Sequence, residues 1–317
     1  MGFIGKRLVI TLITLFLVSV FTFSVFRFIP GDAALLSLGM EAGEEQIQAL
    51  KTEMGLDKSI GGQYISWLGK FLTGRLGNSA RFRGASISGM ILERLPVTFT
   101  LAGISFLLIV FISVPVSFVS AGKENSFADR VVTALSALNI SIPGFFLGVI
   151  FIWIFGVSFR LFVPGAFTGF AEDHGAFFSY LFFPALAIAL PNAALVVKFL
   201  RASIFRELRS DYVRTARSKG GNISHILRRH VFKNASLPAI TLLGMIAGEI
   251  LSGSIVIEQV FGIPGIGRLL IASITARDYL MIETLIIYIA FAVIMANTLA
   301  DIALELIDPR IRLHEKV

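Results

Sequence analysis

Long runs of apolar residues alternate with short polar segments along the chain. Six of these runs have the roughly 20 residues that a helix needs to cross the hydrocarbon core of a bilayer. They cover residues 8–29, 97–121, 131–157, 180–200, 237–257 and 281–304. The pattern predicts an all-α membrane protein with six transmembrane helices. An even number of crossings places both ends of the chain on the same side of the membrane.

Basic residues show which side that is. Ten of the 28 Lys and Arg residues lie between positions 198 and 233, from the end of the fourth run to the segment before the fifth. Cytoplasmic loops carry such an excess of positive charge. We therefore expect both termini in the cytoplasm. Lys6 and Arg7 precede the first run as in a signal peptide, but this run is too long and lacks a small-residue cleavage site, so we expect a retained helix.

The alternation of apolar and polar segments divides the chain into regions. The predicted regions are a first transmembrane helix (1–29), an extracytoplasmic loop region (30–96), a transmembrane core (97–308) that contains a cytoplasmic loop (201–236), and a cytoplasmic tail (309–317). The loop between the first two crossings is long and polar enough to hold structure of its own.

Two short helices are expected in that long loop. The string EEQIQALKTEMGLD begins with acids and has Gly55 near its end, as a helix should. In YISWLGKFL, the spacing of Tyr64, Trp67, Leu68 and Phe71 puts their side chains on one helical face. This face has two interpretations: it lies at the level of the lipid headgroups, or it packs against a neighbouring helix.

Composition narrows the class of protein. The chain is 55% apolar and only 15% charged, whereas soluble proteins carry about 25% charged residues. The net charge of +7 is what basic cytoplasmic loops produce, so we do not expect a nucleic-acid partner. With no cysteine and four scattered histidines, no metal site is expected. The phosphate-binding pattern Gly-x-x-x-x-Gly-Lys-Ser/Thr is missing, so nucleotide chemistry would belong to a partner.

The basic segment also carries a motif. RTARSKG (214–220), with Leu237-Pro238 further on, resembles the cytoplasmic loop of binding-protein-dependent ABC importer permeases, whose general pattern is Glu-Ala-Ala, three residues, Gly and later Leu-Pro. Arg214, Thr215 and Ala216 take the Glu-Ala-Ala positions. The missing glutamate and the longer gap to Leu-Pro are similar to the dipeptide, oligopeptide and nickel permeases, in which DYVRTARxKG is usual.

Further strings extend this resemblance over nearly the whole chain. In order, they are FRFIPGDAA, MGLDKSIGGQYISWLGKFLTGRLGNSARF, ERLPVTFTLA, SIPGFFLG, VIEQVFGIPGIGRLL, ARDYL and LIDPRIR. The resemblance implies the type I ABC importer permease fold in the cytoplasmic (inner) membrane of a bacterium or archaeon. It also implies a homologous second permease, two cytoplasmic ATPase subunits that use ATP and Mg, and an extracytoplasmic solute-binding protein.

The resemblance implies a permease that is not itself an enzyme, with no catalytic residue and no cofactor in this chain. The expected cargo is a di- or oligopeptide, and nickel or a metal chelate is the alternative. A second alternative, from another class, is an ion-coupled secondary transporter, although such carriers often contain repeats and midplane ion sites that this sequence does not display.

The basic segment is expected to hold a short helix from Phe205 to Lys219, ended by Gly220 or Gly221, because glycine accepts the backbone conformation found after helix ends. Leu208, Tyr212 and Ala216 would share one face. The resemblance implies that these three lie in a groove of the ATPase, and the alternative is a surface helix without a partner. The predicted ATPase-coupling loop consists of Leu208, Arg209, Asp211, Tyr212, Arg214, Thr215, Ala216, Arg217, Lys219 and Gly220.

The fifth predicted helix holds the candidate translocation path. Gly244, Gly248 and Ser252 recur every four residues, which permits close helix packing and equally the lining of a channel. Glu249 is an ionisable residue near the middle of the membrane, where such a group usually faces a cavity or a partner. It is either a pathway group for a cationic end of the cargo or a structural hydrogen-bond acceptor.

Three further features lie near the predicted helix ends. Pro143, Pro184 and Pro191 are expected to bend their helices. The loop FGIPGIG, with Pro264, Gly265 and Gly267, is expected to face the solute-binding protein. Arg27 and Asp32 flank the outer end of the first helix, where their long or charged side chains would reach the membrane surface.

Overall fold

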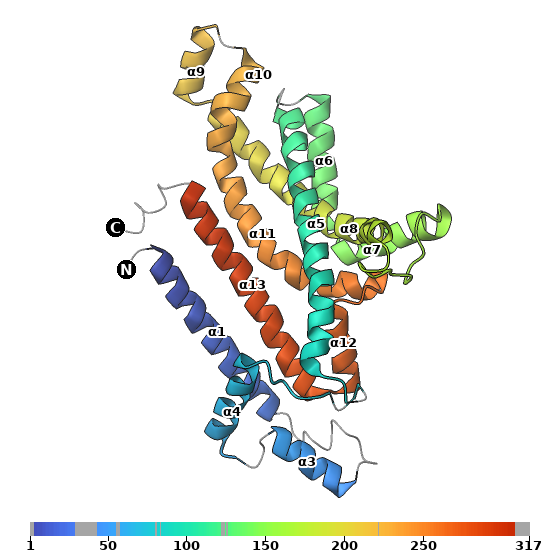
Figure 1. Ribbon diagram of the computed structural model, residues 1–317. Coiled ribbons are helices and arrows are strands. Elements are labelled where there is room, and N and C mark those ends of the chain that lie inside the picture. The colour runs from blue at the N-terminus through green and yellow to red at the C-terminus, as the bar shows by residue number, and fades with distance from the viewer. Residues whose placement is uncertain are drawn as a thin grey trace. The chain divides into compact units, whose positions relative to one another are not determined.

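The computed structural model describes residues 3–28, 43–54, 58–79, 81–82, 84–121, 124, 126–220 and 222–307. These residues form helices and, apart from an isolated β-bridge between Asn78 and Ser86, no β-structure (Figure 1). The helices are α1 (Phe3–Phe28), α3 (Glu44–Met54), α4 (Ile60–Leu72), α5 (Ile87–Ala121), α6 (Phe127–Ser141), α7 (Gly144–Phe151), the π-helix η1 (Ile152–Ser158), α8 (His174–Leu208), α9 (Asp211–Ser218), α10 (Ile223–Ile226), the π-helix η2 (Leu227–Val231), α11 (Phe232–Phe261), α12 (Ile266–Ala276) and α13 (Tyr279–Ile307).

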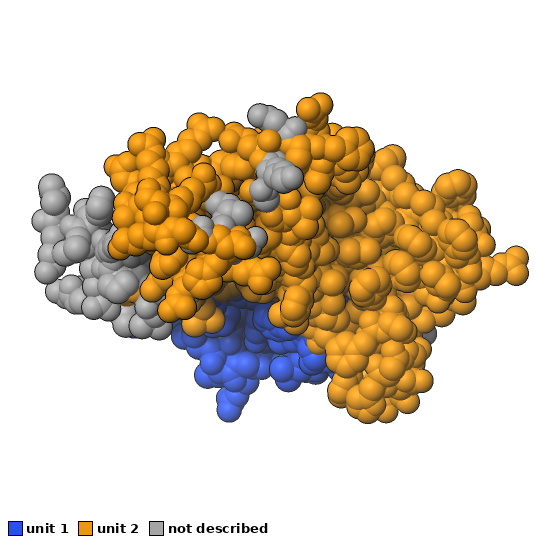
Figure 2. All heavy atoms as spheres, turned by 90° about the horizontal axis from the view of Figure 1, so that it is seen from above, with its two compact units in different colours: residues 1–99, 263–295 blue, residues 100–262, 296–317 orange. Residues whose placement is uncertain are grey.

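The chain forms two compact units, which Figure 2 shows in different colours. Unit 1 contains residues 1–99 and 263–295, and unit 2 contains residues 100–262 and 296–317. The division passes through α5 and α13. The predicted tail 309–317 lies outside the described residues.

Five described helices are long and apolar enough to cross a membrane, and the bent pair Phe127–Ser141 and Gly144–Ser158 makes a sixth where its two helices form one span. The fold class predicted from the hydrophobic pattern is therefore confirmed. Which side of the membrane each loop faces stays a prediction.

The third predicted helix (131–157) is not one rod. It begins at Phe127 and consists of α6, α7 and η1, with 100° between the axes on either side of the break. The break falls at Ile142, which is extended as a residue before proline prefers, and at Pro143, which cannot donate a hydrogen bond to α6. The bend at Pro143 was predicted, but a single helix through it was wrong.

In unit 1, the aromatic face of α4 packs against α1 and α13. Trp67 is buried with Phe23 of α1 and Ile287 of α13, and Tyr64, Leu68 and Phe71 border this cluster. The Tyr64 hydroxyl also lies 2.7 Å from the Ser19 hydroxyl of α1. Of the two interpretations of this face, packing against neighbouring helices is therefore confirmed. The predicted helix before it is α3.

Arg27 does not reach out to the membrane surface as predicted. Its Nε donates to Gln63 at 2.9 Å, and its Nη1 lies 3.2 Å from Oε1 of Glu283, a side chain that is only 1% exposed. The guanidinium also lies over the ring of Phe23. The paired carboxylate satisfies the charge within the protein, so the prediction of an interfacial position was wrong. Asp32 lies outside the described residues.

In unit 2, α8 packs against α6, α7 and α11. Ala185, Ala187, Ala189 and Ala193 of α8 are buried, and such small side chains let helix backbones approach closely. Near one end of α8, the Tyr180 hydroxyl donates to the carbonyl of Phe261, the last residue of α11. These contacts join α8 and α11 along their lengths.

Candidate functional site

The predicted coupling helix is α9, but it is shorter than expected. Phe205 to Leu208 belong to the last turn of α8, and the chain turns at Arg209 and Ser210 before α9 begins at Asp211. A single helix from Phe205 to Lys219 was therefore wrong. A serine followed by an acid is an ordinary start signal for a helix, so the sequence did contain the information that locates this boundary.

Two residues fix the position of α9. Val213 is fully buried, so this side chain anchors the helix to the rest of unit 2. After Lys219, Gly220 adopts φ +81°, which ends the helix in a conformation that residues with a Cβ rarely accept. The predicted end at Gly220 is confirmed. Figure 1 shows α9 beside α10, beyond the end of α8.

Tyr212 connects α9 to both neighbouring helices. Its hydroxyl donates to Oε2 of Glu207 in α8 at 2.7 Å, and it accepts a hydrogen bond of 3.4 Å from the amide of Asn234 in α11. Partial burial raises the pKa of the Tyr212 phenol above its ordinary value, so the hydroxyl keeps its proton at neutral pH. The side chain is 38% exposed, which leaves part of the ring available to a partner.

The outer face of α9 is polar and mainly cationic. Arg214 and Asp211 form an ion pair of 3.4 Å in which both side chains are largely exposed, so it adds little stability. The exposed residues of the coupling loop are Arg209, Asp211, Tyr212, Arg214, Thr215, Arg217, Lys219 and Gly220, whereas Leu208 and Ala216 are half-buried. Because Leu208 lies on α8, the three predicted apolar contact residues do not share one helix.

A buried ion pair supports the base of this loop. Arg201 of α8 contacts Asp129 of α6 with two bonds of 2.6 and 2.8 Å, and its Nε also donates to the Ser120 hydroxyl of α5 at 3.0 Å. Asp129 is only 2% exposed. Further along, Arg209 binds Glu124 at 2.9 Å. The sequence shows these charges but not their pairing, because the partners are 72 and 85 positions apart.

The predicted path residues of α11 fall on different faces. A Cβ on Gly244 would lie 2.9 Å from the Cβ of Ala300, and one on Gly248 would lie 2.2 Å from Oδ1 of Asn297. Both glycines therefore face α13, and close helix packing explains them better than a channel does. Ser252 is exposed, and its hydroxyl donates to the carbonyl of Glu249.

Glu249 itself points away from this packed face. Its side chain is exposed, although it lies within an apolar span. Among the residues that the structure describes, none donates a hydrogen bond to its carboxylate. The structural-acceptor interpretation therefore finds no donor among the described residues. An exposed carboxylate at this depth requires water or a partner subunit.

The predicted outer loop is a tight connection between two helices. Gly262 ends α11 with φ 71°, Gly265 precedes α12, and the backbone N–H of Ile266 donates to the Thr98 hydroxyl at 2.9 Å. Gly265 and Gly267 are buried and Pro264 is half-buried. Contact with a solute-binding protein here stays a prediction, and any such contact would involve Pro264 rather than the glycines.

These features define a class: an all-α, multi-pass membrane subunit with a basic helix placed between two of its spans. Residues 113–313 match the model of the family described as binding-protein-dependent transport system inner membrane component, and residues 1–102 match the model of its N-terminal part. The chain belongs to this family, and it is a multi-pass permease subunit of the bacterial inner membrane.

Two relatives extend the similarity over the full length. The chain is 32% identical over 310 residues to a probable peptide ABC transporter permease of Sinorhizobium fredii, with 98% of this chain and 99% of the relative covered. It is 31% identical over 312 residues to the oligopeptide transport system permease protein AppB of Bacillus subtilis, again with 98% and 99% covered.

Proposed function

We propose that this chain forms half of the translocation pathway of an ATP-driven importer for di- or oligopeptides. Two full-length relatives with peptide or oligopeptide in their names support this cargo over nickel or a metal chelate. The chain would pair with a homologous second permease and receive cargo from an extracytoplasmic solute-binding protein. Two cytoplasmic ATPase subunits would bind and hydrolyse ATP with Mg.

The observation that carries this proposal is the attachment of α9. This helix presents a cationic outer face while Val213 and Tyr212 hold its inner face against unit 2. A partner with an acidic groove would find complementary charge on Arg214 and Arg217. A force on α9 would reach α8 and α11 through the hydrogen bonds of Tyr212.

Displacement of α9 would then spread through α8. Arg201 joins α8 to α6 and α5 through Asp129 and Ser120, and Arg209 joins the loop to Glu124. The ATPase would in this way act on four helices of unit 2 through one contact. The Arg201–Asp129 pair, in which Asp129 is buried, would carry most of this movement, because the exposed Arg209–Glu124 pair adds little.

Glu249 is the residue that we assign to the pathway. Its exposed carboxylate, within a span and without a donor among the described residues, would face the second permease or the cargo. A negative group there suits the amino terminus of a peptide. Gly244 and Gly248 would instead keep α11 close to α13.

Site-specific crosslinking tests the coupling role. The chain contains no cysteine, so a thiol introduced as Arg217→Cys on α9 would be unique in this subunit. We expect it to crosslink to an ATPase subunit in the assembled transporter, and ATP to change the yield. Ser158→Cys, exposed at the end of η1, is the control and should not crosslink to the ATPase.

Two outcomes would contradict the proposal. A thiol on α9 that captures no ATPase would remove the coupling role. Peptide uptake that continues without ATP, and stops when the ion gradient is collapsed, would instead identify a secondary transporter.

A further inference from the structure

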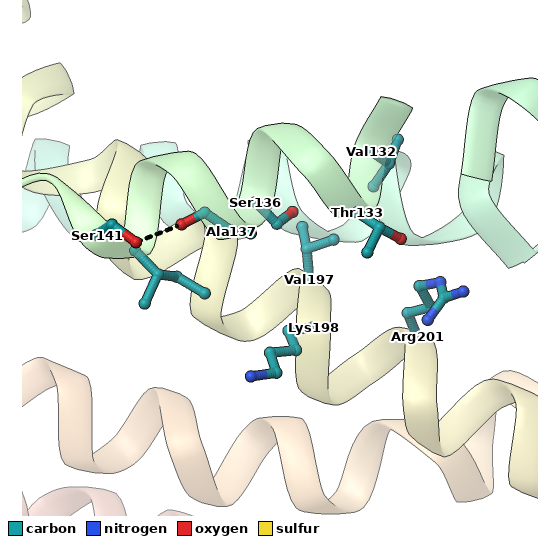
Figure 3. Close-up of a pocket in the computed structure, with 9 residues that line it drawn as sticks. Val132, Thr133, Ser136, Ala137, Ser141, Val197, Lys198 and Arg201 are labelled. Carbon is teal, nitrogen blue, oxygen red and sulfur yellow. Dashed lines mark hydrogen bonds between the residues drawn. The ribbon is translucent and has the colours of Figure 1, made fainter. Parts of the chain in front are cut away.

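A cavity of about 440 Å³ lies between α6 and α8 in unit 2 (Figure 3). This volume is within the range of pockets that bind small molecules, about 300–1,000 Å³. Its lining consists of Val132, Thr133, Ser136, Ala137, Ile140 and Ser141 of α6 and Val197, Lys198 and Arg201 of α8. The α6 residues follow helical spacing, so one face of that helix forms an entire wall.

The cavity carries one uncompensated positive charge. Arg201 is neutralised by its two bonds to Asp129. Lys198, one turn earlier on α8, is exposed and pairs with no carboxylate in the described ranges. In Figure 3 the side chains of Val197 and Arg201 point towards α6, whereas the side chain of Lys198 extends from α8 away from α6. An ammonium group at the rim of a pocket within a span attracts an anionic ligand.

The hydroxyl groups of the wall define a second requirement. Thr133 and Ser141 donate their protons to carbonyls of α6, at 2.8 and 2.9 Å. A hydroxyl that has used its proton can only accept further hydrogen bonds. These oxygens therefore suit a ligand with N–H donors.

We propose that this cavity is a transient binding site for the carboxyl end of a short peptide. The Lys198 ammonium would hold the terminal carboxylate, and the oxygens of Thr133 and Ser141 would accept hydrogen bonds from backbone N–H groups. This inference rests on the proposed peptide cargo and adds to it the recognition of a free C-terminus.

The proposed attraction of anions to the cavity is tested by thiol labelling, which needs no transport measurement. Ser136→Cys places the chain's only thiol in the cavity wall, and Ala137→Cys gives a second position should the first variant not assemble. The assembled transporter in phosphatidylcholine nanodiscs is reacted with an anionic and a cationic thiol reagent of similar size. We expect Lys198→Met to lower the anionic-to-cationic rate ratio by about tenfold.

Lys233→Met is the matched control, because it removes the same charge from unit 2 outside the cavity. It should leave the ratio unchanged. A ratio that Lys198→Met does not alter, or that Lys233→Met alters equally, would show that the cavity does not attract anions through Lys198.

The ligand is tested by protection of the same thiol. Alanyl-phenylalanine should slow labelling several-fold more than its C-terminal amide does, and Lys198→Met should remove the difference. Equal protection by both, or protection by phosphatidylglycerol in place of the peptide, would overturn the inference. If the wild-type transporter imports this dipeptide and the thiol is not protected, the inference alone fails. If no peptide is imported, the proposed function fails.

Discussion

Two regions of unit 2 are held together by different chemistry. Along the middle of α11, Gly244 contacts Ala300 so closely that there is no space for an added carbon. At the α9 end, the contacts are polar: Tyr212 bonds to Glu207 and Asn234, and Arg201 bonds to Asp129. Close packing resists any change in shape, whereas the single hydrogen bonds of Tyr212 contribute only about 1 kcal/mol each, and the two-bond Arg201–Asp129 pair contributes more. The comparison suggests a rigid helix pair with an adjustable joint at its end.

The largest loss of stability is expected from Asp129→Asn. Removing the carboxylate leaves the Arg201 side chain, which is 26% exposed, without its counter-charge, and this should cost about 3 kcal/mol, the lower end of the range for buried pairs. The thermal unfolding midpoint of the purified permease in detergent should fall clearly. Glu124→Gln breaks the exposed pair with Arg209 and should cost less than about 1 kcal/mol. Equal effects of the two variants would show that burial does not distinguish these pairs.

A graded glycine series tests the packed region. Gly244→Ala should destabilise by about 1–3 kcal/mol, because the Cβ of Ala300 is fixed to its backbone and cannot give way. Gly248→Ala should cost less, since the neighbouring atom is the end of the Asn297 side chain, which can rotate. Gly253→Ala meets nothing within 4 Å and should be neutral or stabilising.

The thermal unfolding midpoints of the three variants measure these differences in stability. If Gly253→Ala destabilised as much as Gly244→Ala, helix contact with α13 would not be the reason for the small residues on α11.

The sequence predicted most of the helices but few of the side-chain contacts between them. Apolar length alone located the spans, and Pro143 located the bend in the third. Because glycine accepts positive φ, the sequence also predicted that α9 ends at Gly220. Ion pairs could not be predicted, because Arg201 finds Asp129, and Arg27 finds Glu283, only once distant helices pack.

The apolar contact face of the coupling helix failed for a local reason. Periodicity places Leu208 in register with Tyr212, yet the helix breaks between them at Ser210, whose hydroxyl donates to the carbonyl of Glu207 at 2.6 Å. Serine competes with the helical backbone in this way. Periodicity gives the spacing of these residues but does not show where the helix is interrupted.

Gly220→Val is expected to disturb the joint through backbone strain. A β-branched residue at φ +81° costs about 1–2 kcal/mol, although no neighbouring atom would clash. We expect the subunit to insert and assemble but peptide uptake to be lost, because α9 would end in another direction. Gly74→Val imposes the same strain at φ +69° in unit 1 and should keep uptake. Normal uptake by Gly220→Val would show that the geometry of this helix end does not matter.

The smallest effect on stability is expected from Tyr212→Phe. This variant keeps the ring and removes only the hydroxyl that bonds to Glu207 of α8 and Asn234 of α11. One net hydrogen bond is worth about 1 kcal/mol, so the thermal midpoint should hardly change. Transport per ATP hydrolysed should fall about fivefold, the factor to which that free energy corresponds. Glu207→Gln retains an acceptor for the phenol and is the matched control, with transport close to that of the wild type.

The pH dependence of coupling distinguishes a role of the hydrogen bond between Tyr212 and Glu207 from a role of the Tyr212 ring in packing alone. Because burial raises the pKa of the Tyr212 phenol, the proton that bonds to Glu207 stays in place between about pH 6 and pH 9. The ratio of wild-type to Tyr212→Phe coupling should therefore be constant over this range. It should decline only above the raised pKa, where the phenolate repels the carboxylate of Glu207. A ratio that already changes near neutral pH would mean that another titrating group carries movement from α9 to α8 and α11.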